Sequence, residues 1–176
     1  MSFENKFSEQ EQVLLTSLPT LAGSVMSLAE GSGLGTISEM MSSAKTMLSG
    51  AKDFSTNEII TAILPNMENR DEAMTKAKEL REKIKSHLQS YQVKSKDELR
   101  QRVIEDCKTV NELLSSKADP KEAEEYKKWV LNIAEDVSKA AKEGGFLGFG
   151  GTQVSEGETK LFDEISAALN VKRSLN

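Results

Sequence analysis

The stretch that decides the fold is DPKEAEEYKKWVLNIAEDVSKAAKEG, residues 119–144. Asp119 can cap a helix, and Pro120 suits the first helical position because its missing N–H costs nothing there. Glu122 completes a capping box, and Gly144 can take the conformation that ends a helix. The stretch therefore predicts one long helix. Its inward face carries apolar residues at steps of three and four, namely Ala123, Tyr126, Val130, Ile133, Val137 and Ala141.

The same combination of a cap and an apolar stripe recurs along the chain. Each further start has a Ser, Thr or Asn followed three residues later by Glu, and no segment has the alternation of a β-strand. The pattern predicts an all-α, bundle-like domain of six or seven helices. The other helices are expected at residues 8–30, 36–51, 55–64, 69–91, 95–114 and 155–169.

Charge is distributed unevenly along the chain. Residues 12–67 carry six charged side chains, whereas residues 68–143 carry 34 among 76. The first third is therefore expected to be the buried part. At 176 residues the chain suits a single helical domain, residues 1–176. Its parts are low-charge helices at 8–67, long charged helices at 69–143, a glycine loop at 144–151 and a final helix at 155–169.

Three expectations concern the shape and packing of individual helices. Pro19 is expected to bend or restart the first helix. Residues 12–29 have no charge and nearly the length of a membrane span, but Ser and Thr dilute them and no basic flank orients them. A buried helix is favoured, and a membrane-seeking one stays open. The helix at 69–91 and the next one are joined by a short link, which predicts antiparallel neighbours.

The composition limits the function classes. A net charge of −5 and a pI near 5.1 give the chain as a whole no basic field for nucleic acid or for an anionic membrane. A single cysteine excludes an intramolecular disulfide. The first residues resemble no secretory signal, so a cytoplasmic setting is expected.

Candidate chemical groups are few. His87 is the one histidine, and the residue three before it is Ile84, so the Glu-x-x-His pairs of a di-iron bundle are absent. Cys107 has no imidazole other than His87 to activate it, and a pairing of these two stays open if their helices are neighbours. We predict no catalytic residue, no cofactor-binding residue and no metal ligand, and hence a protein that is not an enzyme.

The glycine loop, residues 144–151, carries Phe146, Leu147 and Phe149 between its glycines. It lacks the Gly-Lys-Ser/Thr of a phosphate-binding loop. Phe146 is expected to fold back over Ala141 and stabilise the helix end, whereas Leu147 and Phe149 are candidates for contact with a partner or ligand.

Two methionines of the predicted helix at 36–51, Met40 and Met47, are further contact candidates because methionine suits adaptable surfaces.

The run from Trp129 to Gly151, followed by Val154, Ser155 and Glu158, resembles the C-terminal signature of a mainly bacterial family of helical proteins. The family is one for which no activity is established. The resemblance implies a bacterial setting and supports the helix boundaries, and it implies no function.

These observations favour a non-enzymatic interaction or scaffold protein with an unidentified protein partner and no nucleic acid. Two alternatives stay open. One is a carrier that encloses an apolar small molecule or lipid between Met40, Met47 and the glycine loop. The other is a membrane-active bundle whose low-charge N-terminal helices enter a bilayer, a reading that is possible but not favoured.

Overall fold

The computed structural model describes residues 2–29, 53–66, 68–143 and 156–171. Every regular element in these ranges is a helix, which confirms the all-α prediction. The helix expected at 36–51 lies outside them, and the short first helix was not predicted. The elements are α1 (Phe3–Lys6), α2 (Glu9–Ala29), α5 (Glu58–Ile63), α6 (Arg70–Ser90), α7 (Lys96–Lys117), α8 (Pro120–Glu143) and α9 (Glu156–Ala168).

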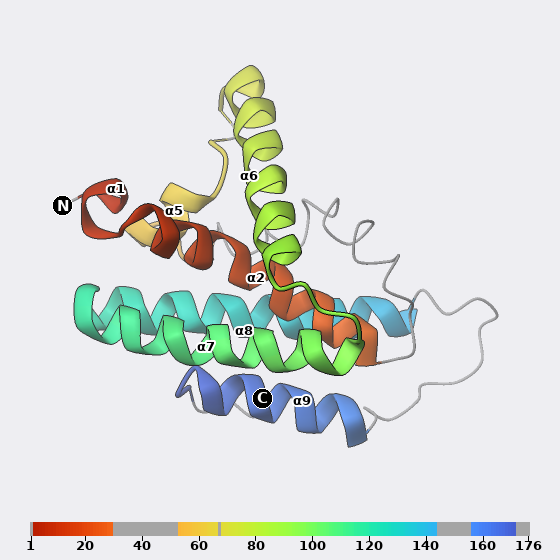
Figure 1. Cartoon of the computed structure of the whole chain (residues 1–176). Coiled ribbons are helices and arrows are strands. Elements are labelled where there is room, and N and C mark those ends of the chain that lie inside the picture. The colour runs from red at the N-terminus through yellow and green to blue at the C-terminus, as the bar shows by residue number, and fades with distance from the viewer. Residues whose placement is uncertain (1, 30–52, 67, 144–155, 172–176) are drawn as a thin grey trace.

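The helix α2 lies at the centre of the bundle. It packs against α6, α7, α8 and α9, most extensively against α8. In Figure 1, α7 and α8 lie side by side and run in opposite directions, with α2 above them and α9 below. Within α2, all residues from Leu14 to Leu28 are buried, including five Ser and Thr. The absence of charge therefore predicted the buried helix correctly.

Pro19 lies inside α2, which continues as one helix from Glu9 to Ala29, so of the two predicted outcomes, a bend or a restart, the restart is excluded. A proline cannot donate to the carbonyl four residues earlier, which here belongs to Leu15. The hydroxyl of Tyr126 on α8 donates to that carbonyl at 2.6 Å. The hydrogen bond that Pro19 cannot make is thus supplied by the neighbouring helix.

A close approach between α2 and α8 occurs at Gly23. A Cβ atom at this position would lie 3.1 Å from Cγ2 of Val137 and 3.4 Å from Cγ2 of Ile133. The first distance is shorter than an ordinary carbon–carbon contact, so a side chain at Gly23 would require Val137 to shift by a few tenths of an ångström. The glycine that dilutes the apolar character of α2 therefore lets α8 pack tightly against it.

The predicted antiparallel pairing of α6 with α7 is wrong. Figure 1 shows α6 standing across the long axis of α7, and its packing is chiefly against α2. The link is short as expected, but Gln92 takes a left-handed conformation with φ of 52°. The short link therefore limits the distance between the two helix ends without setting the angle between the helices.

Helix capping follows the sequence at most of the described starts. At α2 the capping box is reciprocal, because the backbone N–H of Ser8 donates to Glu11 at 2.8 Å and that of Glu11 donates to Ser8 Oγ at 3.4 Å. At α7, Ser95 Oγ accepts from the N–H of Glu98 at 3.2 Å. The Glu98 carboxylate accepts from the N–H of Lys94, one residue before the cap.

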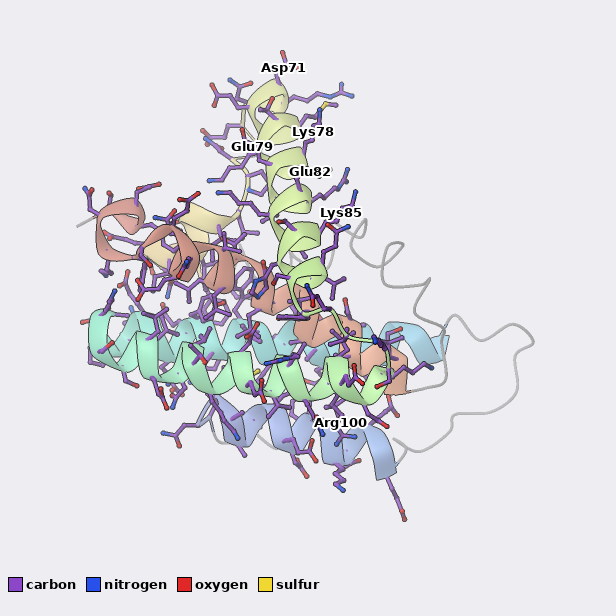
Figure 2. All side chains as sticks on the ribbon, viewed as in Figure 1. Asp71, Lys78, Glu79, Glu82, Lys85 and Arg100 are labelled. Atoms are coloured by element: carbon purple, nitrogen blue, oxygen red, sulfur yellow. The ribbon has the colours of Figure 1, made fainter. Side chains whose placement is uncertain are left out.

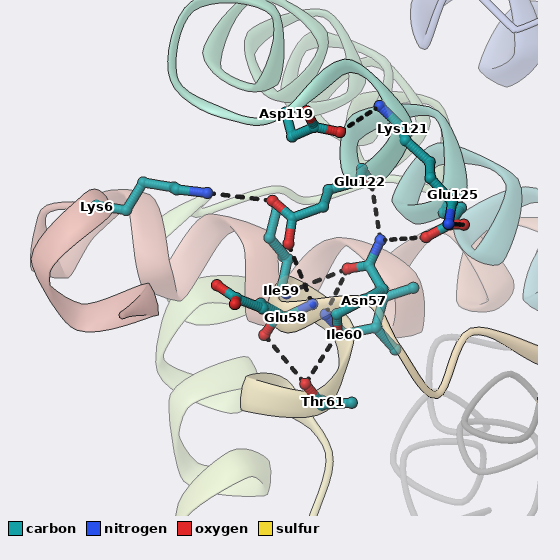
Figure 3. Close-up of polar contacts among 10 residues, drawn as sticks. All are labelled: Lys6, Asn57, Glu58, Ile59, Ile60, Thr61, Asp119, Lys121, Glu122 and Glu125. Carbon is teal, nitrogen blue, oxygen red and sulfur yellow. Dashed lines mark hydrogen bonds and ion pairs between the residues drawn. The ribbon is translucent and has the colours of Figure 1, made fainter. Parts of the chain in front are cut away.

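The cap of α5 is Asn57 and not the predicted Ser55. The Asn57 side-chain oxygen accepts from the N–H groups of Ile59 and Ile60, at 3.1 and 3.0 Å, and its amide nitrogen donates to the Glu122 carbonyl at 3.0 Å (Figure 3). The Glu122 carboxylate, predicted to close a capping box with Asp119, binds Lys6 Nζ at 3.1 Å and the N–H of Glu58 at 3.2 Å. These contacts join α1, α5 and α8.

Candidate functional site

The helix α6 is the part of the described chain that departs most from the bundle. In Figure 1 its N-terminal half projects beyond the layer formed by the other long helices. Asn69 caps it by accepting from the N–H groups of Asp71 at 3.2 Å and Glu72 at 3.4 Å. The two acidic residues of the first turn also suit the positive end of the helix dipole. The exposed end of α6 is thus stabilised by its own sequence.

One face of α6 is held by the rest of the protein. Ala73, Leu80 and Ile84 are buried on that face. Near the projecting end, Lys76 Nζ donates to the carbonyl of Ala62 on α5 at 2.5 Å. The remaining faces meet solvent, and Met74 is 63% exposed, the one large hydrophobic side chain with high exposure in the described ranges.

The charged side chains of α6 are numerous and form no ion pairs with other described residues. The helix carries six basic and four acidic side chains, which leaves 17 basic and 24 acidic ones in the rest of the chain. None of these ten forms an ion pair with another described residue, whereas Arg100 on α7 binds Glu164 on α9 at 2.6 Å. Figure 2 shows Asp71, Lys78, Glu79, Glu82 and Lys85 extending from α6. These side chains are therefore available to another molecule.

The C-terminal end of α6 is anchored to α7 by three polar side chains. His87 Nε2 lies 3.0 Å from Asp106 Oδ2, and the Tyr91 hydroxyl donates a short hydrogen bond to the same oxygen. The Tyr91 hydroxyl also lies 3.2 Å from His87 Nε2, and the two rings meet edge to face with centroids 5.0 Å apart. One carboxylate on α7 thus binds two side chains one turn apart on α6.

The electrostatics of this anchor favour a structural role. Burial, and to a smaller extent the hydrogen bond to Asp106, raises the pKa of the Tyr91 hydroxyl well above its usual value. Tyr91 therefore remains a hydrogen-bond donor throughout the neutral and mildly alkaline range. His87 is thus a partly buried histidine whose ring has hydrogen-bond partners.

Cys107 does not form the pair with His87 that the sequence left open. The thiol is fully buried, and burial together with the nearby Asp106 raises its pKa. Within the described ranges no hydrogen bond joins it to His87, whose ring is bonded to Asp106 and Tyr91. Because the thiolate is the reactive form, a buried and protonated thiol is a poor nucleophile.

A second polar contact lies inside the bundle between α8 and α9. Glu158, expected to cap the last helix together with Ser155, is buried and accepts a hydrogen bond from Ser138 Oγ at 2.6 Å. Ser155 lies outside the described residues. The contact joins the two helices and offers no opening to solvent.

The predicted contact residues fall where the structure gives no description. Met40 and Met47 lie in residues 30–52, and Leu147 and Phe149 lie in residues 144–155. The described ranges contain no group of three or more His, Cys, Asp or Glu that could hold a metal ion. They also contain no helix with the length and apolar character needed to cross a membrane.

The sequence did not predict the projection of α6, because the short link to the next helix led to the expectation of antiparallel neighbours. A signal was present in the spacing. Arg70, Lys78, Arg81 and Lys85 share one side of a helix, whereas the acidic residues of α6 lie beside them.

Comparison of the chain with protein-family models, with curated proteins and with solved structures finds no match.

Proposed function

We propose that the protein is a non-enzymatic interaction or scaffold protein and that α6 is the element that contacts its partner. The observation that carries the proposal is the projection of α6 with ten charged side chains, none of which forms an ion pair with another described residue (Figures 1 and 2). The bundle of α2, α7, α8 and α9 would serve as the rigid base that positions this helix.

The burial and the hydrogen bonds of the other polar groups support a non-enzymatic role and the choice of α6 as the contact element. Cys107 is buried with a raised pKa, and His87 and Tyr91 are bound to Asp106 at the base of α6. The bonds of His87 and Tyr91 to Asp106 hold the base of α6 in place without involving its exposed charged side chains. The proposed setting is the bacterial cytoplasm, which rests on the sequence alone.

Site-specific photo-cross-linking would test the proposal. A photoreactive amino acid would be placed in the full chain at Lys78 or at Glu79, two exposed positions on different sides of α6. Matched controls would carry it at Gln101 or Glu112, exposed positions on α7. In extracts of the source cells, we expect the same partner to be captured from at least one α6 position, and an excess of unlabelled protein to abolish the capture.

Equal capture from the α7 positions, or capture that unlabelled protein does not reduce, would contradict the assignment of α6. Circular dichroism of each variant would show that the substitution leaves the fold unchanged.

A further inference from the structure

The basic side chains on one side of α6 form a continuous stripe. Arg70, Lys78, Arg81 and Lys85 are separated by eight, three and four residues, and Met74 fills the first interval. All five side chains are exposed. At 1.5 Å per residue the stripe is about 22 Å long and stays on one helical face. Figure 2 shows Lys78 and Lys85 on the same side of the helix. We call these five residues the basic stripe.

The acidic side chains of α6 lie beside the basic stripe and not within it. Asp71 and Glu82 border the stripe, and Glu72 and Glu79 lie further round the helix. No described side chain forms an ion pair or hydrogen bond with the four basic groups. The stripe is thus a row of four solvent-exposed basic side chains with the exposed side chain of Met74 among them.

We infer that the basic stripe binds an acidic helical segment of another protein. This inference rests on the proposed function and adds the chemistry of the partner. Carboxylates one or two turns apart on the segment would meet Lys78, Arg81 and Lys85, and an apolar side chain would contact Met74. Two helices that cross at a shallow angle can make such contacts along several turns.

The charge of the rest of the chain favours a short acidic segment over a long polyanion. Outside α6 the chain carries seven more acidic than basic side chains, 24 against 17. Nucleic acids and anionic bilayers extend well beyond a stripe about 22 Å long, so they would meet Asp71, Glu82 and the net negative charge of the rest of the chain. A short helix that lies along the stripe meets mainly the four basic groups.

Fluorescence anisotropy would test the inference with a defined probe. The probe is a synthetic helical peptide with Glu on one face and a central Leu, and its counterpart with Lys in place of Glu is the control peptide. The full chain would be titrated into each at low ionic strength. We expect the acidic peptide to bind with an affinity that falls as salt rises, and the basic peptide not to bind.

Two charge-matched variants of the full chain identify the surface. Lys78→Glu with Lys85→Glu reverses two charges within the stripe, whereas Lys83→Glu with Lys108→Glu reverses two exposed charges outside it. We expect the stripe variant to lose about tenfold or more in affinity and the control to change by about twofold or less. Met74→Ser should weaken binding without changing its salt dependence. Equal loss in both charge variants would overturn the inference.

Single-stranded DNA and vesicles containing phosphatidylserine would be titrated in parallel. Tighter binding of either probe than of the acidic peptide, with the same dependence on Lys78 and Lys85, would assign the stripe to a polyanion and overturn the inference. No binding of the acidic peptide would overturn it as well. The proposed function would survive either result if α6 still captured a partner from Glu79, so the two failures are distinguishable.

Discussion

The helices α2 and α6 have the same length, 21 residues, and opposite environments. The two charged residues of α2 both lie in its first turn, and every residue from 14 to 28 is buried. The helix α6 carries ten charged residues along its length and projects from the bundle (Figure 1). The comparison shows two ways in which a sequence can specify a helix, through the local preferences of its residues or through packing against neighbouring helices.

Local preferences explain α6 and not α2. Residues such as Ala, Leu, Met, Glu, Lys and Arg, which favour the helix intrinsically, make up most of α6. In contrast, α2 contains seven Ser, Thr, Gly and Pro residues between 16 and 27, all of which disfavour a helix interior. It is helical because burial and its neighbours compensate, as Tyr126 does at Pro19. An exposed α2 would therefore be unstable, whereas an exposed α6 is not.

The largest effect is expected for a cavity in α2. Leu18 is fully buried, so Leu18→Ala should lower the free energy of unfolding by about 2–5 kcal/mol. Urea denaturation monitored by circular dichroism measures this free energy of unfolding. A loss below about 1 kcal/mol would mean that α2 is not the centre of the core.

The contact between Pro19 and Tyr126 can be tested by a double-mutant cycle. Tyr126→Phe leaves the Leu15 carbonyl buried without a donor and should cost about 1–3 kcal/mol. Pro19→Ala restores a backbone N–H that can bind this carbonyl. In the Pro19→Ala background the Tyr126→Phe substitution should therefore cost less. Equal costs in both backgrounds would show that the hydroxyl does not replace the missing bond.

Alkaline pH should destabilise the core through Cys107, whose pKa burial raises above its ordinary value of 9.0. Above that pH the unfolded chain loses the thiol proton while the folded chain keeps it, so the stability present below pH 9 is lost as pH rises. The loss is about 1.4 kcal/mol for each pH unit while the folded thiol stays protonated.

Urea midpoints for the parent and for Cys107→Ala, measured from pH 8 to about pH 10, check this prediction. The alanine variant should be less stable at pH 8 because the buried sulfur is removed, and its midpoint should fall less steeply with pH. Parallel curves would contradict a buried, protonated thiol. Fast reaction of the native protein with a thiol reagent would contradict it independently.

A local effect is expected where α6 meets α7. Tyr91→Phe removes the hydroxyl that donates to Asp106 and should cost about 1 kcal/mol. Hydrogen exchange should show faster opening of the amides of α6, with little change in α2 and α8. Uniform acceleration across all helices would mean that α6 does not open separately from the bundle.

The smallest effect on stability is expected at the exposed end of α6. Met74 is 63% exposed, so Met74→Ser should change the free energy of unfolding by about 0.5 kcal/mol or less. Thermal melts of this variant and of Leu18→Ala, recorded together, give the contrast between the two helices directly. A destabilisation above about 1 kcal/mol would mean that Met74 packs against the protein in solution.

Caps and apolar stripes predicted the helices because both are local signals. The stripe from Ala123 to Val137 lies on the buried face of α8, and Ser8 and Asn69 cap α2 and α6. The same reasoning was wrong at Ser55, and wrong at Glu122 in predicting a bond from its carboxylate to Asp119. Asn57 caps α5 and binds α8 at once, and the Glu122 carboxylate has partners on α1 and α5. At these two positions contacts between distant segments, which local signals do not contain, decided the capping.

The sequence by itself determined the helical class, the positions of the long helices and the burial of α2, because periodicity, caps and the absence of charge act within a few turns. Tertiary structure alone decided the direction of α6, the donor for the Leu15 carbonyl and the partner of His87. Each of these depends on which residues meet after distant segments pack together. A short link between α6 and α7 allows many angles, and packing against α2 and the bonds to Asp106 select one.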